Sequence, residues 1–123
     1  MRRDMDLVRE VLSEVADEGP RDAEDFVRDG LSVSDVAYHF DIMQQAGLIE
    51  ASVQRSSADR YRGGVALQLT WQGQDFLAAV GSDAVWVKVK RALRDCVGDA
   101  TLGTVKSIGA KLGAAAIEAQ LGI

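Results

Sequence analysis

The sequence predicts an α+β fold that is mostly helical. Apolar residues recur at helical spacing in several long segments, and only one stretch, near the middle of the chain, alternates as strands do. The 123 residues are 47% hydrophobic and 27% charged, a composition that supports one globular core and excludes a disordered chain. Pro20 is the single proline, so long helices are permitted almost everywhere.

The first predicted helix covers about residues 4–17. Apolar side chains at i, i+3, i+4 and i+7 spacing form its inward stripe: Met5, Leu7, Val8, Val11, Leu12 and Val15. Gly19 and Pro20 end this helix. Residues 21–30 are acidic and weakly patterned, and they allow either a short strand or a poor helix.

The clearest predicted element is a helix over residues 33–46. Ser32 and Asp35 form a capping-box-like start, with aspartate in place of the usual glutamate. Apolar residues then recur at helical spacing, and Gly47 follows as a C-terminal cap with an apolar residue beyond it. These signals define both ends of the helix.

A β-hairpin is predicted directly after this helix. Its first strand covers residues 49–55, and its second strand contains the alternating residues Val65, Leu67 and Leu69. Residues 56–63 form a polar, basic loop between the two strands. A helix, a glycine stop and a hairpin with a basic loop are the last parts of a winged helix-turn-helix. The predicted fold is therefore a winged helix-turn-helix-like domain with a two-stranded wing and a C-terminal helical extension.

Three further helices follow the predicted wing. Thr70 caps the first of them, and the three cover about residues 71–80, 83–97 and 102–121. We expect residues 1–81 to form the winged-helix-like domain and residues 82–123 to pack on it or to form a dimer interface. The large apolar side chains of this part are expected in the core: Trp71, Phe76, Leu77 and Trp86.

Two segments resemble parts of known regulators. Residues 36–49, VAYHFDIMQQAGLI, resemble the recognition helix and following strand of arsenic-repressor-like winged helices. Residues 69–77, LTWQGQDFL, resemble the "LT-x-x-G-x-x-(x)-L" segment that leaves the wing in several regulator families. From residues 3–7 to residues 86–90, the whole chain is similar to a family of short bacterial and phage proteins classed as a domain of unknown function. That resemblance implies occurrence in phages, prophages and other mobile DNA, and it implies no activity.

The predicted recognition helix is acidic where a DNA reader is basic. Residues 31–50 contain no lysine or arginine and three acidic residues, whereas the resembled repressors carry basic residues on the outward face of this helix. Contacts to bases and phosphates depend on such basic residues. The candidate binding residues on the helix face are Ser34, Tyr38, His39, Asp41, Gln44 and Gln45. The candidate binding residues on the wing are Arg55, Arg60, Tyr61 and Arg62, which are basic and aromatic as a phosphate contact requires.

These features support two binding hypotheses. The favoured one is a winged-helix scaffold used for protein–protein interaction, in a phage or mobile-element accessory protein that acts on a protein partner such as a host factor. The alternative is a DNA-binding transcriptional regulator that contacts double-stranded DNA with residues 33–46 and the wing residues 55–63. A homodimer through the C-terminal helices is a further expectation.

No catalytic, metal or cofactor site is predicted. His39 is the only histidine, so no metal set of two histidines exists. Besides its place on the helix face, His39 allows a second interpretation as a partly buried residue beside Asp35. Cys96 lies in an apolar stripe without a neighbouring base, so we expect it to pack in the core. The sequence shows neither a signal peptide nor a membrane span, and we expect a non-enzymatic cytoplasmic protein that does not contact a membrane.

Overall fold

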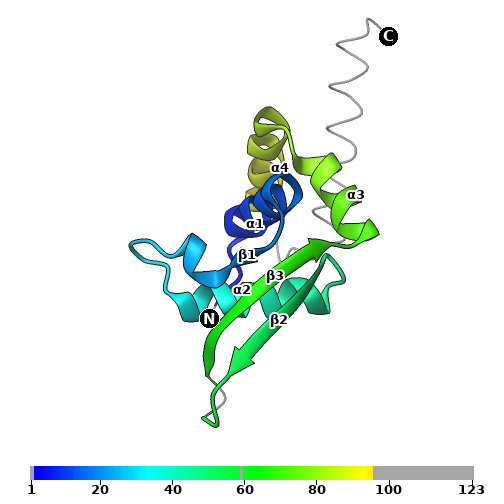
Figure 1. Ribbon diagram of the computed structural model, residues 1–123. Coiled ribbons are helices and arrows are strands. Elements are labelled where there is room, and N and C mark those ends of the chain that lie inside the picture. Colours follow the sequence, from blue (N-terminus) through cyan, green and yellow to red (C-terminus); the bar gives the residue numbers. More distant parts are fainter. Residues whose placement is uncertain (1, 59, 96–123) are drawn as a thin grey trace, which may run out of the picture. The chain divides into compact units, whose positions relative to one another are not determined.

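The computed structural model describes residues 2–58 and 60–95 (Figure 1). The chain divides into two compact units, residues 1–74 and residues 75–123. The described residues form four α-helices, one 3-10 helix and a three-stranded antiparallel sheet, and the α+β prediction is thereby confirmed. Cys96 and the predicted helix over residues 102–121 lie outside the described residues.

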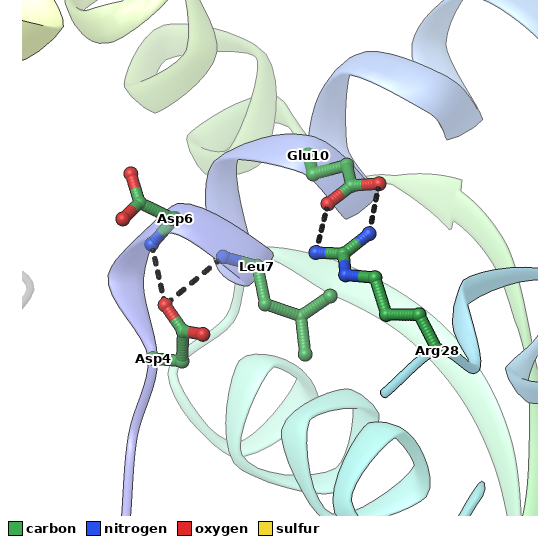
Figure 2. Close-up of polar contacts among 5 residues, drawn as sticks. All are labelled: Asp4, Asp6, Leu7, Glu10 and Arg28. Atoms are coloured by element: carbon green, nitrogen blue, oxygen red, sulfur yellow. Dashed lines mark hydrogen bonds and ion pairs between the residues drawn. The ribbon is translucent and has the colours of Figure 1, made fainter. Parts of the chain in front are cut away.

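Helix α1 (Met5–Glu18) begins at Asp4 and ends at Gly19. The Asp4 carboxylate accepts hydrogen bonds from the backbone N–H groups of Asp6 (3.0 Å) and Leu7 (3.4 Å), two donors that have no partner within the helix (Figure 2). The predicted inward stripe is confirmed for five of its residues, which are buried: Leu7, Val8, Val11, Leu12 and Val15.

Residues 21–30, for which the sequence allowed a short strand or a poor helix, contain a short strand and a short helix. Strand β1 (Arg21–Asp22) is followed at once by the 3-10 helix η1 (Ala23–Phe26). Asp22 and Asp25 form a reciprocal capping box at the start of η1. Phe26 is buried, and its ring meets that of Phe40 edge-on with centroids 6.1 Å apart. Phe26 is the one large apolar side chain of the segment that is buried, which explains why its hydrophobic pattern was weak.

Helix α2 (Val33–Gln45) has the capping box that the sequence predicts. The Ser32 hydroxyl accepts from the Asp35 N–H (3.2 Å), and the Asp35 carboxylate accepts from the Ser32 N–H (3.0 Å). Gly47 has a φ of 78°, the left-handed conformation that favours glycine just beyond a helix. The inward face of α2 packs on β2, β3, η1 and α1.

The wing consists of β2 (Ile49–Arg55) and β3 (Tyr61–Leu69). β3 is the central strand of the sheet, in the order β1–β3–β2. The predicted loop over residues 56–63 is too long, because β3 begins at Tyr61, which pairs with Arg55. The Tyr61 side chain is anchored on α2, so the ordered strand extends further than hydropathy alternation indicates. The order of helices and strands and this sheet order are consistent with a winged-helix-like arrangement (Figure 1).

Helix α3 (Trp71–Val80) starts at the predicted cap. The Thr70 hydroxyl accepts from the Gly73 N–H at 3.1 Å and donates to the Gly47 carbonyl oxygen. The Thr70 N–H donates to the Leu48 carbonyl oxygen at 3.0 Å. The start of α3 is therefore bonded to the turn that ends α2.

Helix α4 (Asp83–Asp95) carries the predicted apolar face, of which Trp86 and Val89 are buried. Phe76 is also buried, as predicted. The prediction that Trp71 lies in the core is wrong, because its side chain is 81% exposed. Among the described residues, the helices are too short or too polar to cross a membrane.

Candidate macromolecule-binding surface

One stripe of α2 faces away from the core. Ser34, Tyr38, Asp41 and Gln45 follow each other at spacings of four, three and four residues, which places them on one side of the helix. All four retain solvent exposure, whereas the opposite side carries the buried residues Val36, Ala37, Phe40 and Met43. We call these four residues the outward stripe.

The turn-side end of the wing is bonded to the outward stripe. The Tyr61 hydroxyl donates to the Asp41 carboxylate at 2.6 Å. The Tyr61 ring also meets the Tyr38 ring edge-on at 5.7 Å, and the Arg55 guanidinium lies 4.4 Å from the centroid of the Tyr61 ring. The structure thus brings together two helix residues and two wing residues that the sequence predicted separately, and we call these four residues the helix–wing cluster.

The helix–wing cluster fixes a negative charge on the outward stripe. A carboxylate that accepts a short hydrogen bond from a phenol is held in one orientation. The Asp41 carboxylate is therefore oriented by Tyr61 where another molecule would approach α2. One turn and a half earlier, the hydrogen bonds from Ser32 lower the pKa of Asp35, the backbone N–H having the largest effect. The Asp35 carboxylate is consequently ionised at neutral pH, and α2 has no lysine or arginine.

Gln44 and Gln45 occupy different positions at the end of α2. The Gln44 side-chain oxygen accepts from the Ala51 N–H at 2.7 Å, so Gln44 covers part of the outer edge of β2. β2 is an edge strand of the sheet, and its outward N–H groups would otherwise be open to another strand. Gln45 is exposed and belongs to the outward stripe. Of the two, Gln44 has a structural role and Gln45 is available to a partner.

His39 does not lie on the outward face. Its side chain is 2% exposed, and the interpretation as a buried residue near Asp35 is confirmed. Its Nε2 accepts from the Asp4 N–H at 2.8 Å, so Nδ1 carries the proton and donates to the Asp35 carbonyl oxygen at 2.7 Å. The ring therefore joins the start of α1 to the first turn of α2, and the prediction of an exposed, contacting His39 is wrong.

The arginines of the wing do not form one surface. Arg55 lies over Tyr61 on the side of the wing that faces α2. Arg62 is exposed and follows Tyr61 directly in β3, so its side chain projects from the other side of the strand. Arg60 is exposed at the turn, where its N–H and carbonyl oxygen bond Ser56. The wing therefore does not direct Arg55, Arg60 and Arg62 toward one common base or phosphate surface.

Two basic residues precede the contact between the amino-terminal segment and α2. The Asp4 N–H donates a hydrogen bond to His39 of α2. Arg2 and Arg3 come directly before Asp4 in the sequence. Both arginines are exposed. No local pattern could reveal this, because the hydrogen bond spans 35 residues of sequence.

The acidic side chains of α1 and η1 are largely occupied by contacts within the domain. Arg28 forms two hydrogen bonds with the Glu10 carboxylate, at 2.9 and 2.7 Å, and these bonds raise the pKa of Arg28 (Figure 2). Asp22 and Asp25 cap η1. Within residues 2–58 and 60–95, no three His, Cys, Asp or Glu side chains are grouped to hold a metal ion. Glu24 and Asp29, in the same acidic segment, are exposed.

Comparison with known proteins gives a family match and a relative that aligns over most of its length. Residues 2–99 match the family described as "Hypothetical protein (DUF2513)". A protein of Haemophilus influenzae with the printed name "Uncharacterized protein" is 32% identical over 111 residues, which cover 88% of this chain and 92% of the relative. No solved structure matches the chain. Because the family match spans both the outward stripe and the wing, the chain belongs to the DUF2513 family.

Proposed function

We propose that this winged-helix-like protein is a non-enzymatic protein-binding module, of the accessory kind that phages and other mobile DNA carry, and that it acts in the cytoplasm. Its partner contacts the outward stripe of α2 and the adjacent wing. The observation that carries the proposal is the Asp41 carboxylate, which Tyr61 holds at the centre of the stripe. A winged helix that used this face for DNA would place that carboxylate toward the phosphates.

The sign and the position of the charges on the outward stripe favour a protein partner over DNA. DNA affinity comes largely from lysine and arginine that displace counterions from phosphates. The outward stripe consists of a serine, a tyrosine, a glutamine and the Asp41 carboxylate, and it contains no basic residue. Tyrosine is enriched at protein interfaces, and glutamine and serine supply hydrogen bonds without charge. This composition suits a protein surface better than a DNA groove.

A DNA-binding regulator is the second candidate, and two observations favour it. The element order is consistent with a winged helix, and the exposed residues Arg2, Arg3 and Arg60 belong to segments next to α2 or at the wing tip. Basic arms and wing tips contact the minor groove and the phosphates in other proteins. The fixed Asp41 opposes this use, and fold analogy alone is a weak argument for function.

The two candidates differ in how they respond to salt. We expect the full chain to show no specific binding to labelled duplexes of mixed sequence in a fluorescence anisotropy titration, and only weak retention at low salt. Tight binding that weakens steeply with salt, and that disappears when Arg55, Arg60 and Arg62 are replaced by alanine, would overturn the proposal in favour of the regulator.

The positive test uses a photo-crosslinking amino acid at Gln45 in the cell of origin. We expect a discrete protein adduct from Gln45 and none from the same group at Glu24, which is exposed on η1. The expected homodimer through residues 82–123 would be recognised separately, as a second species in sedimentation of the purified chain. Equal adducts from both positions, or none from Gln45, would contradict a partner site on the outward stripe.

A further inference from the structure

His39 is a buried titratable side chain with a backbone partner at each nitrogen of its ring. The side chain is 2% exposed. Its Nε2 accepts from the Asp4 N–H at 2.8 Å, and its Nδ1 donates to the Asp35 carbonyl oxygen at 2.7 Å. The bond to Asp4 exists only while Nε2 carries no proton, because a protonated ring nitrogen cannot accept. This contact between the start of α1 and α2 therefore requires a neutral ring.

The two bonds of His39 would respond in opposite ways to a second proton. A protonated imidazole carries an N–H group at both nitrogens. At Nδ1 the bond to the Asp35 carbonyl oxygen would persist, and the positive charge would strengthen it. At Nε2 the added hydrogen would face the Asp4 N–H, which is also a donor. Protonation would thus break the bond to the start of α1 and keep the bond within α2.

The groups that surround the ring act on its charge in two directions. Burial disfavours a charged side chain, whereas a nearby carboxylate favours a positive one. The Asp35 carboxylate interacts electrostatically with His39, and Asp4 carries a second carboxylate beside the N–H that the ring accepts from. The Tyr38 ring meets the imidazole edge-on, with centroids 5.4 Å apart. A proton on His39 would therefore be offset by acidic groups on both sides of the ring.

The other charged side chains of the elements that pack on α2 make no contact with the imidazole. In the described part of the chain, His39 has no hydrogen bond, ion pair or ring contact with β2, β3 or η1, nor with α1 beyond Asp4. The charged side chains on η1, β2, β3 and the first half of α1 are Glu24, Asp25, Glu50, Arg55, Arg62, Asp6, Arg9 and Glu10. The direct effects on the ring come from Asp4, Asp35 and Tyr38.

The loss of the bond between Asp4 and His39 would remain local. Leu7 and Val8, which follow in the first turn of α1, are 0% and 1% exposed, so the helix stays anchored in the core. The Asp4 carboxylate bonds the N–H groups of Asp6 and Leu7, and these bonds do not involve His39 (Figure 2). The opening would end where α1 begins.

We propose that His39 is an acid-sensitive latch that holds the amino-terminal segment on α2. The latch is closed while the ring is neutral. As the pH falls and the ring takes up a proton, His39 keeps Asp35 and releases Asp4, so that the exposed residues Arg2 and Arg3 lose this anchor. Histidine is the side chain that ordinarily changes its charge between pH about 5 and 8. The latch belongs to the chain itself and does not depend on the proposed partner.

NMR spectroscopy of the ¹⁵N-labelled full chain between pH about 8 and 5 tests the latch. The ring nitrogen shifts report the protonation of His39, and the Asp4 amide reports the bond. We expect one midpoint for both, with the hydrogen-exchange protection of the Asp4 amide falling by about fivefold to tenfold, as for the loss of one hydrogen bond. The amides of Val11 and Leu12 in the middle of α1 should keep their protection.

Three results of this titration would overturn the inference. The first is an Asp4 amide that does not respond while His39 takes up its proton. The second is a loss of protection at Val11 and Leu12 with the same midpoint, because α1 as a whole would then be released. The third is a ring that stays neutral until the domain unfolds.

His39→Gln separates the imidazole from the neighbouring carboxyl groups. Glutamine can accept a hydrogen bond through its side-chain oxygen, and it does not titrate. We expect the pH response of the Asp4 amide to disappear in this variant. The matched control is Tyr38→Phe, which keeps the ring contact with the imidazole and should keep the response of the parent chain. A response with the parent midpoint in His39→Gln would assign the effect to the carboxyl groups of Asp4 or Asp35 and overturn the latch. Should His39→Gln fail to fold, as judged by circular dichroism, the comparison of midpoints in the parent chain still decides.

Discussion

Gly73 shows how a single missing side chain determines the junction between α2 and α3. The backbone of α3 passes so close to Leu48 that a Cβ at Gly73 would lie 3.0 Å from the Leu48 carbonyl carbon and overlap its oxygen. Neither group belongs to a flexible side chain that could move away. The glycine of the LTWQG sequence is therefore required by packing, and Thr70 secures the same junction with hydrogen bonds to Gly47 and Leu48.

We expect Gly73→Ala to destabilise the protein, although alanine is normally the better helix residue. An exposed helical glycine replaced by alanine gains about 1 kcal/mol. At Gly73 the overlap with Leu48 should instead cost about 1–3 kcal/mol net, as overpacking does elsewhere. Urea unfolding of the full chain measures the change. Gly63→Ala is the control, because its Cβ would meet only the Gln54 side chain at 3.8 Å. A Gly73→Ala protein as stable as Gly63→Ala would contradict the packing argument.

His39 and Trp71 mark the limit of inference from sequence at the scale of the residue. Both lie on well-predicted helices, yet the sequence left two interpretations open for His39, and the exposure of Trp71 was predicted incorrectly. His39 lies at the border of the inward face, and its burial depends on the Asp4 N–H, a partner 35 residues away. Helical periodicity specifies the direction of a side chain around the helix axis. It does not specify which part of the chain packs against that side chain.

At the scale of the elements, α2 and the wing act as one unit through the helix–wing cluster. Tyr61 belongs to β3, and its hydroxyl reaches Asp41 of α2. The predicted end of the loop was wrong at this point, since the pattern of alternating hydropathy starts only at Val65. The capping box of α2 and the glycine stop were predictable because they depend on neighbours within four residues. The turn-side end of the wing was not predictable, because its order depends on a contact between elements.

We expect Tyr61→Phe to weaken the attachment of the wing. The substitution keeps the ring contacts with Tyr38 and Arg55 and leaves the half-buried Asp41 carboxylate without the phenol donor. The loss should be about 1–2 kcal/mol in the free energy of unfolding, at the lower end for a charged acceptor because Asp41 is partly solvated. A double-mutant cycle with Asp41→Asn isolates the pair. A coupling energy near zero would show that the two groups do not stabilise each other.

The start of α2 should make stability depend on acid. The bonds from Ser32 lower the pKa of Asp35 in the folded protein below its unfolded value of about 4. A lowered folded pKa means that the stabilisation is complete above pH about 4 and is lost as the pH falls through the folded pKa. We therefore expect Asp35→Asn to cost about 0.5–1 kcal/mol at pH 6, with the difference from the parent chain shrinking below pH about 4. A difference that stays constant down to pH 2 would exclude an ionised cap.

At the scale of the whole molecule, fold and charge point in different directions. The net charge is −5, and the basic residues lie outside the helix that a winged helix would place in a DNA groove. This conflict was visible in the sequence, because residue types and helix faces suffice to state it. The structure sharpened it by showing that Asp41 is held in place and that Arg2 and Arg3 immediately precede the bond to α2. Long-range contacts of this kind are absent from local sequence patterns.

We expect that the lack of positive charge on the outward stripe is what keeps this protein from binding DNA. Ser34→Arg together with Gln45→Arg adds two positive charges to the outward stripe without disturbing the helix–wing cluster. We expect the double variant to gain salt-dependent affinity for mixed-sequence duplexes, with a salt slope steeper by about two phosphate contacts. Ala16→Arg together with Val27→Arg is the matched control, because it adds the same charge at exposed positions of α1 and directly after η1. If both double variants bind equally, net charge matters and the position of α2 does not, so the outward stripe would lose its status as the face toward a macromolecule.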